Sequence, residues 1–137
     1  MTGESPRETV ERLLSAMNAH DIEAFVGCFD AEYVSEQPVH PDRAFGGVEQ
    51  VRTNWSSIFD ALPDFRAELK SVIEDQQSAW SEWHWTATKA DGEVFDWRGV
   101  IIMGIREARI TWMRLYMEPT QFAGAGIDAA VRDMREG

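Results

Sequence analysis

The period of the hydrophobic pattern changes once along this chain, at Pro63, and this change constrains the fold more than any other feature. Before Pro63, apolar residues recur at the three- and four-residue spacing of amphipathic helices, whereas after it they alternate with polar residues. The second part is predicted to form four strands, at residues 65–73, 79–89, 94–105 and 109–118. Helices followed by an antiparallel meander indicate an α+β fold, with the helices packed on one face of a curved sheet.

Local signals mark three helices in the first part. Ser5 and Glu8 have the spacing of a capping box, with Pro6 at the first helical position. Asp21 is predicted to cap a second, short helix. A third helix is predicted to follow Gly47. Each helix therefore has a start signal of its own.

Two further segments lie outside this pattern. Residues Tyr33–Gln37 are predicted to form a short strand that Pro38 stops, between the second and third helices. Residues Ile127–Arg135 are predicted to form a terminal amphipathic helix, which either docks on the domain or frays.

A chain of 137 residues is long enough for one compact domain. We therefore expect a single domain over residues 1–120 and a C-terminal tail over residues 121–137.

The chain is acidic, because 24 Asp and Glu residues against 13 Lys and Arg residues give a formal net charge of −11. This charge repels phosphate backbones and anionic lipid headgroups, so neither a nucleic acid nor a membrane is an expected partner. Cys28 has no second cysteine to pair with, and no secretory leader opens the chain, which predicts a cytoplasmic protein. The three His residues lack a helical metal-binding spacing and no cofactor motif is present, so we expect neither a metal nor an organic cofactor.

The loop between the second and third meander strands decides which face of the sheet lines the interior. Residues 89–93 suit a three-residue loop with a glycine bulge, which pairs Trp85 with Trp97. A two-residue loop would exchange the two faces, and the hydrophobic pattern favours the three-residue loop. In that register the concave face carries Trp83, Trp85, Trp97, Ile101, Met103, Met113, Leu115 and Met117.

Two interpretations of this Trp- and Met-rich face stay open. It is either a well-filled core or the wall of a pocket for a mostly apolar small molecule. Three helices cover only part of a long curved sheet, which leaves room for an open end. In the pocket interpretation, the ligand contacts come from Gln37, Trp55 and six residues of the concave face: Trp83, Trp85, Trp97, Ile101, Met113 and Met117.

Three groups of residues are informative in their order and spacing. They are Asn18–Asp21 with Phe29–Glu32, Phe45–Gly47 with Leu62–Phe65, and Arg109–Trp112 with Tyr116. Together they resemble the nuclear transport factor two-like superfamily, which includes ketosteroid isomerases, SnoaL-type polyketide cyclases and limonene epoxide hydrolases. The resemblance covers about residues 5–120. It implies a cone-shaped fold, with three helices packed in a strongly curved, mostly antiparallel sheet, a pocket at the wide end, and often a dimer.

The catalytic groups of these enzymes are missing at the positions that the resemblance assigns to them. The general base of the isomerases falls on Gln37, their oxyanion-hole acid falls near Ile101, and their tyrosine on the first helix falls near Leu13. The acid of the cyclases also falls near Ile101, and the last aspartate of the epoxide hydrolases falls near Leu115. None of these four residues titrates at neutral pH, so the known mechanisms of the superfamily are not expected.

Other titratable residues near the expected pocket mouth remain candidates. His40 and Glu36 are the predicted catalytic pair, since a histidine oriented by a carboxylate can move a proton at neutral pH. The alternative interpretation makes His40 a solvated loop residue. Whether Glu36 or Gln37 faces the pocket also stays open. His84 is predicted to lie on the outer sheet face beside Arg98, in an ordinary polar cluster.

Two functions fit these features. The first is a cofactor-independent isomerase, cyclase, dehydratase or epoxide hydrolase that acts on a small hydrophobic molecule. The alternative is a non-catalytic dimeric module that binds a ligand in the same pocket. The polar loop near His40 favours the enzyme, whereas the lost catalytic groups favour the binding module.

The convex face of the predicted sheet is unusually apolar. It carries Trp80, Val100, Ile102, Trp112 and Tyr116. A monomer rarely exposes so large an apolar patch, and the resemblance implies pairing through this face, so we expect a homodimer. In the alternative interpretation, the C-terminal tail folds back and covers the patch within one chain.

Overall fold

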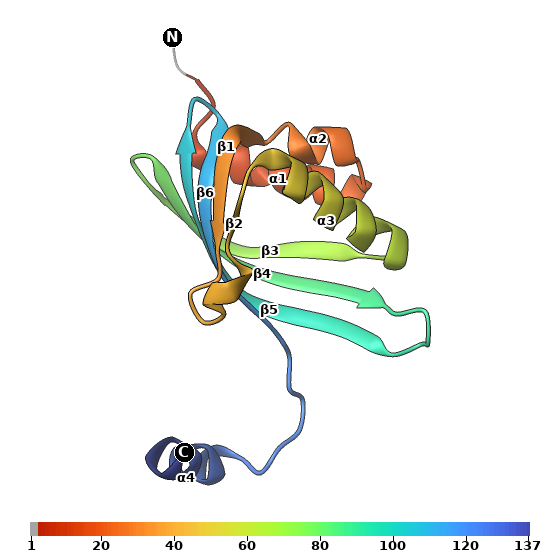
Figure 1. Cartoon of the computed structure of the whole chain (residues 1–137), viewed down its shortest axis with the longest axis vertical. Helices are drawn as coiled ribbons and strands as arrows, with labels where there is room; N and C mark the ends of the chain where they lie inside the picture. The colour runs from red at the N-terminus through yellow and green to blue at the C-terminus, as the bar shows by residue number, and fades with distance from the viewer. Residues whose placement is uncertain (1–2) are drawn as a thin grey trace.

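The computed structural model describes residues 3–137, which form a curved sheet with helices on its concave side (Figure 1). The helices are α1 (Pro6–Ala19), α2 (Ile22–Val26), α3 (Val48–Ala61) and α4 (Ile127–Glu136), with one 3-10 turn, η1 (Pro41–Arg43). The strands are β1 (Phe29–Glu36), β2 (Phe45–Gly46), β3 (Arg66–Asp75), β4 (Ser78–Thr88), β5 (Val94–Arg106) and β6 (Arg109–Pro119). The four meander strands agree with the sequence prediction to within two residues at each end.

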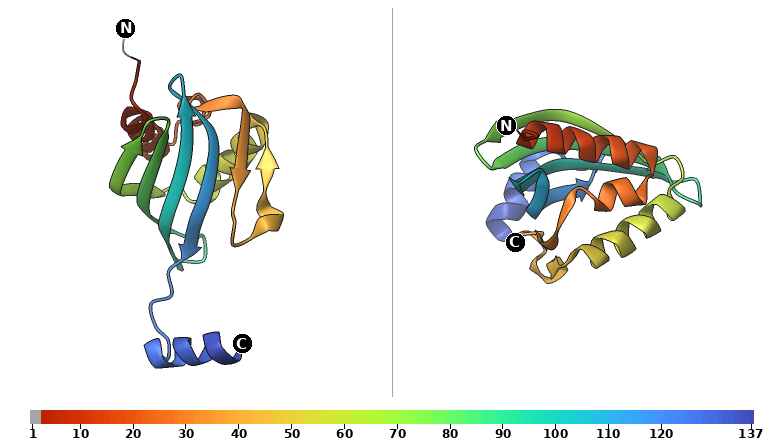
Figure 2. Two further views of the ribbon diagram at one scale, coloured as in Figure 1. Left: turned by 90° about the vertical axis from the view of Figure 1, so that its left-hand side faces the viewer. Right: turned by 90° about the horizontal axis from the view of Figure 1, so that it is seen from above.

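The sheet has six strands in the order β2-β1-β6-β5-β4-β3. All neighbouring strands are antiparallel except β1 and β6, which run parallel. Helices α1, α2 and α3 lie together on one side of this sheet, as the two views of Figure 2 show. The predicted α+β cone, with three helices packed in a curved and mostly antiparallel sheet, is confirmed.

The predicted start signals of the first two helices are present. The Ser5 hydroxyl accepts a hydrogen bond from the Glu8 backbone N–H at 3.2 Å, and the Glu8 carboxylate accepts one from the Ser5 backbone N–H at 2.9 Å. The Asp21 carboxylate accepts a hydrogen bond from the Ala24 backbone N–H at 3.1 Å. These contacts satisfy backbone donors that the first turn of a helix leaves free.

The register between β4 and β5 is the one that the three-residue loop predicts. Trp85 pairs with Trp97, and Trp83 pairs with Gly99. In the loop, Gly92 has a φ of 87° and its N–H donates to the Lys89 carbonyl at 2.8 Å. Glycine adopts this left-handed conformation without a steric penalty, so this loop chemistry sets the register locally.

Strand β1 differs from its prediction. The sequence predicts a strand at Tyr33–Gln37, whereas β1 spans Phe29–Glu36. The additional residues pair with β6, where Phe29 lies beside Ile110, and an irregularity separates this pairing from that of Val34 with Trp112. Pairing with a strand about eighty residues away is not visible in local propensity, which explains the missed residues.

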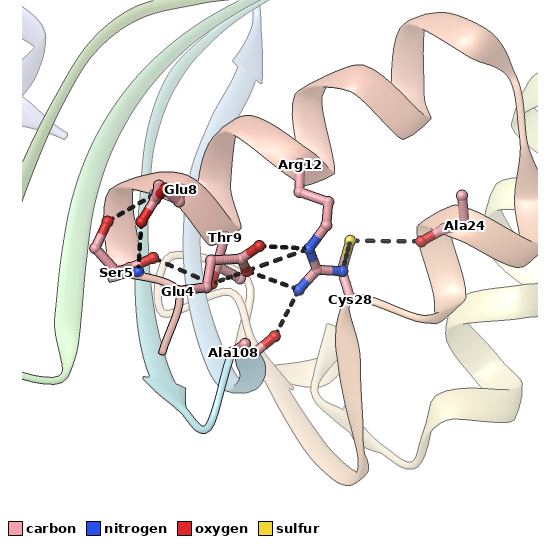
Figure 3. Close-up of polar contacts among 8 residues, drawn as sticks. All are labelled: Glu4, Ser5, Glu8, Thr9, Arg12, Ala24, Cys28 and Ala108. Atoms are coloured by element: carbon pink, nitrogen blue, oxygen red, sulfur yellow. Dashed lines mark hydrogen bonds and ion pairs between the residues drawn. The ribbon is translucent and has the colours of Figure 1, made fainter. Parts of the chain in front are cut away.

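A polar cluster around Arg12, which we call the Arg12 clasp, joins α1 to three other segments (Figure 3). The Arg12 guanidinium donates to the Glu4 carboxylate at 3.0 Å, to the Cys28 sulfur at 3.2 Å and to the Ala108 carbonyl at 2.6 Å. Ala108 and its neighbour Glu107 form the β5–β6 turn, and both have positive φ values, 63° and 51°. Such conformations are unfavourable for residues other than glycine, so the contact with Arg12 helps to hold this turn.

The C-terminal tail does not cover the sheet. Helix α4 lies away from the other elements (Figures 1 and 2), and none of its residues is buried. The interpretation in which the tail folds back over the convex face of its own chain is therefore wrong. Among the described helices, none is long and apolar enough to cross a membrane.

Candidate functional site

A cavity of about 260 Å³ lies between the helices and the concave face of the sheet. Its wall is mostly aromatic and aliphatic, and it includes all eight residues that the sequence analysis predicts to contact a ligand. The lining residues are Leu13, Met17, Phe25, Phe29, Tyr33, Ser35, Gln37, Phe45, Val51, Asn54, Trp55, Ile58, Trp83, Trp85, Trp97, Ile101, Met113, Leu115 and Met117. The concave face is therefore not completely filled by its own side chains.

Strand β1 and the residue after it supply one polar side of the cavity. Tyr33, Ser35 and Gln37 line it, because alternate residues of an extended chain point to the same side. Tyr33 and Ser35 are buried, whereas Val34 and Glu36 are exposed. The question of whether Glu36 or Gln37 faces the cavity is thereby answered in favour of Gln37.

The predicted catalytic pair does not meet at the cavity. Glu36 lies on the exposed side of β1 next to Arg114, and His40 lies in the loop that follows. Nε2 of His40 lies 2.9 Å from the Glu118 carboxylate at the end of β6, and both side chains are partly exposed. Neither His40 nor Glu36 is among the cavity-lining residues. The partner of His40 is 78 residues away along the chain, so spacing alone gives no signal for it.

His84 belongs to a polar cluster outside the cavity, as the sequence analysis predicts. Its Nε2 lies 2.9 Å from the Asp96 carboxylate, which also accepts hydrogen bonds from Thr120 at 2.6 Å and from Arg98 at 3.1 Å. The hydrogen bond from Thr120, helped by those from His84 and Arg98, lowers the pKa of Asp96 from 3.8 to about 2. The cluster ties β4, β5 and the residue after β6 together. No group of three His, Cys, Asp or Glu side chains within residues 3–137 is arranged to hold a metal ion.

The cavity lining contains a single ionisable side chain. This is Tyr33, and burial raises the pKa of its phenol above the usual value, although a hydrogen bond with Ser35 acts in the opposite direction. The other lining residues are apolar or carry hydroxyl, amide or indole groups. The cavity wall therefore offers no side chain that exchanges a proton near neutral pH.

Indole groups in the wall differ in their hydrogen bonding. Nε1 of Trp83 donates to the Ser81 hydroxyl at 2.8 Å, and that hydroxyl donates to the Ile101 carbonyl at 2.7 Å. Nε1 of Trp85 is buried and has no hydrogen-bond partner. Buried polar groups are nearly always paired, so the unpaired indole N–H of Trp85 lowers the stability of the folded chain.

Sequence reasoning missed three polar residues of the lining. Tyr33 and Ser35 point to the same side of the extended chain as Gln37, because side chains alternate along it. The prediction that Gln37 contacts a ligand therefore already implies them. Asn54 lies one residue before Trp55 on α3, and its place at the edge of the apolar face gave no comparable signal.

A family model described as a SnoaL-like domain matches residues 10–113, which is most of the chain. The chain belongs to the SnoaL-like domain family. Its fold and its structural neighbours are those of the nuclear transport factor two-like superfamily. None of the curated proteins matches this chain.

Solved structures with the same fold have low sequence identity to this SnoaL-like protein. IdmH from Streptomyces antibioticus, a proposed polyketide cyclase, has a TM-score of 0.72 and 16% identity, over 82% of this chain and 91% of its own. AclR from Streptomyces galilaeus, a proposed hydroxylase, has a TM-score of 0.72 and 15% identity, over 82% and 88% of the two chains. A proposed ketosteroid isomerase from Kribbella flavida has a TM-score of 0.69 and 14% identity, over 90% and 85%. At these identities the likeness concerns the fold alone.

Proposed function

We propose that this protein binds a small, uncharged and mostly apolar molecule in the cavity without performing acid–base chemistry on it. The observation that carries this proposal is the composition of the wall, in which Tyr33 is the only ionisable side chain. General acid–base catalysis needs a group within reach of the substrate whose pKa lies near the working pH. A phenol with a raised pKa does not meet that requirement.

The four positions where the superfamily enzymes keep catalytic groups support the same proposal. Leu13, Gln37, Ile101 and Leu115 all line the cavity. These positions, onto which the resemblance places the catalytic groups, carry aliphatic or amide side chains. A cavity that keeps its place in the fold while its proton-transferring groups are replaced is better suited to binding than to proton transfer.

Charge and size restrict the ligand. A charged group buried in this wall would have no counter-charge, and an unpaired buried charge is strongly unfavourable. The cavity volume of about 260 Å³ lies just below the range of roughly 300–1,000 Å³ that is typical of drug-sized ligands. An uncharged molecule of two or three fused rings fits these limits.

Isothermal titration calorimetry with fluorene, a small uncharged aromatic hydrocarbon, tests this proposal. We expect saturable binding that Leu115→Trp abolishes, because the larger side chain occupies the cavity. Ile73→Trp is the matched control, since Ile73 is 66% exposed on β3 and does not line the cavity. Binding that survives in the Leu115 variant, with a folded protein by circular dichroism, would contradict the proposed site.

A cofactor-independent enzyme that works by positioning alone is a second candidate. It is favoured by the mutual contacts of the aromatic wall, where Trp55 meets Trp85 edge to face with ring centroids 5.5 Å apart. A rigid wall can accelerate an intramolecular reaction by holding a substrate in its reactive conformation. Such an enzyme would show turnover that does not vary between about pH 5 and pH 9, because no side chain in the wall titrates there. A bell-shaped pH profile would contradict it.

We also propose that two copies of the chain pair through the convex sheet face. Trp80 and Tyr116 are 55% and 38% exposed there, on β4 and β6, the two strands that flank β5. The net charge of −11 opposes pairing, but salt screens charges that lie farther apart than about 8 Å.

Sedimentation at micromolar concentration tests this pairing. We expect about twice the chain mass of 15.6 kDa, and a shift towards the monomer for Trp112→Glu. Ile127→Glu places the same charge on α4 and should leave the dimer intact. A monomeric wild-type chain would contradict the dimer, and dissociation by the Ile127 variant alone would assign the contact to α4.

A further inference from the structure

The loop that follows β1 borders the mouth of the cavity. The lining residues that are half-buried, and that therefore mark the mouth, are Gln37, Phe45, Asn54, Trp55, Ile58, Trp97 and Leu115. The rest of the lining is buried. Residues 38–44 join Gln37 to Phe45 on β2, so both ends of this loop are attached to residues of the mouth. A change in the position of the loop therefore changes the size of the mouth.

A single side chain connects this loop with another strand of the sheet. The backbone hydrogen bonds of the loop are made within residues 37–44, such as the one from the Arg43 N–H to the His40 carbonyl at 3.0 Å. Among the described residues 3–137, the hydrogen bond that reaches another strand joins Nε2 of His40 to the Glu118 carboxylate on β6, at 2.9 Å. A carboxylate only accepts hydrogen bonds, so Nε2 of His40 carries the hydrogen and donates it. The other residues of the loop are exposed.

The far end of the loop meets a possible hinge at Gly47. This glycine has a φ of 93°, and no other part of the chain lies within 4 Å of the place where a Cβ would stand. Strand β2 has two residues and lies at the edge of the sheet, and the Gly47 N–H donates to the Tyr33 carbonyl at 2.7 Å. Hinges are a few residues at the ends of elements that absorb changes in backbone angles. Separation of β2 from β1 about Gly47 would carry Phe45 away from the mouth.

We propose that residues 38–46 form a gate at the mouth of the cavity, and that the hydrogen bond between His40 and Glu118 is the latch that keeps this gate closed. The inference rests on the proposed binding function and specifies how access to the same cavity is controlled. Neither His40 nor Glu118 lines the cavity, so the latch is made whether or not a ligand is bound. Loss of the latch therefore changes how fast a ligand enters and leaves, and it does not change the affinity.

Stopped-flow measurement of tryptophan fluorescence during the binding of fluorene tests the gate. We expect His40→Ala and Glu118→Ala each to raise the association and dissociation rate constants by the same factor, about threefold, which is the size of effect that a partly exposed ion pair produces. The dissociation constant should stay the same. His84→Ala is the matched control, because it removes a histidine that lies 2.9 Å from a carboxylate on the convex face, and it should change neither rate. Unchanged rates in both latch variants, or faster dissociation alone, would overturn the gate.

Amide hydrogen exchange tests the latch without a ligand. The Gly47 amide is protected by its hydrogen bond to Tyr33, so its exchange rate measures how often β2 separates from β1. We expect about threefold faster exchange in both latch variants and no change in His84→Ala. Unchanged exchange in the latch variants would overturn the latch even if fluorene binds. Faster exchange in both would support it even if the wild type does not bind fluorene, a result that would overturn the binding function alone.

Discussion

Arg12 and Leu13 are neighbours on α1, yet they belong to two regions that differ in whether their polar groups have hydrogen-bond partners. Arg12 lies in the clasp, where its guanidinium is paired with Glu4, Cys28 and Ala108 (Figure 3). Leu13 lines the cavity, where the buried indole N–H of Trp85, another lining residue, has no acceptor. A polar group that finds its partners within the chain contributes to folding. One that stays buried without a partner lowers the stability of the folded chain.

The largest effect that tests this comparison comes from a cavity residue whose polar group is paired. Trp83 is 1% exposed, and its indole is hydrogen-bonded to Ser81. We expect Trp83→Ala to lower the free energy of unfolding by about 3–5 kcal/mol, because a large cavity replaces the ring. Urea unfolding measures the change, and Trp80→Ala, at a position 55% exposed on the same strand, is the control. Equal losses in the two variants would contradict the assignment of Trp83 to the core.

Removal of the clasp should have the next largest effect. We expect Arg12→Met to lower the free energy of unfolding by about 2 kcal/mol, since several charge-assisted hydrogen bonds are lost while the alkyl stem is kept. Burial raises the pKa of the Cys28 thiol, although Arg12 acts in the opposite direction, and the thiol is buried, so it should react slowly with thiol reagents in the wild type. Loss of Arg12 raises this pKa further, so faster labelling in the variant would report opening of the region around Cys28. Arg66→Met, on the exposed side of β3, is the control. Unchanged labelling of Cys28 would show that the clasp does not close this region.

A smaller difference should separate the paired and unpaired indoles. Trp83→Phe removes a donor that has an acceptor, whereas Trp85→Phe removes one that has none. We therefore expect Trp83→Phe to lower the free energy of unfolding by about 1 kcal/mol more than Trp85→Phe. Chemical denaturation of both variants without ligand measures this difference. The opposite order would mean that Trp85 has a partner in solution, which would weaken the comparison between the two regions.

The smallest expected change in the free energy of unfolding comes from the polar cluster around Asp96, and it depends on pH. Hydrogen bonds from Thr120, His84 and Arg98 lower the pKa of Asp96 from 3.8 to about 2. A lowered carboxyl pKa means that the charged form stabilises the folded state, so this contribution is complete above about pH 4 and is lost as the pH falls through about 2. The free energies of unfolding of the wild type and Asp96→Asn should therefore differ by a constant amount above pH 5 and converge near pH 2. A difference that does not change with pH would contradict the assignment.

Much of the fold could be predicted from the sequence because the relevant signals are local. The capping box at Ser5, the cap at Asp21 and the loop at residues 89–93 each involve residues only a few positions apart. The loop fixed the pairing of Trp85 with Trp97, and with it the concave face. The alternation of side chains along each meander strand then indicated the six tryptophan, isoleucine and methionine residues of these strands that line the cavity.

The contacts of the candidate catalytic pair could not be predicted from such local signals. His40 and Glu36 are close in sequence, but the direction of Glu36 depends on how β1 pairs with β6. The partner of His40 is Glu118, at the far end of the chain. Both facts depend on contacts between segments that are distant in sequence, for which local propensity carries no signal.

The sequence by itself determined the helices, the four meander strands, their order, the hairpin register and the family, since these follow from spacing, turn chemistry and alternation over short distances. The tertiary structure alone decided that Gln37 faces the cavity in place of Glu36, that α4 lies away from the sheet, and that the amide oxygen of Gln37 accepts a hydrogen bond from Arg43. The physical reason is that a polar side chain acquires its role from the partners that surround it. Those partners come together only when the distant strands and helices have packed.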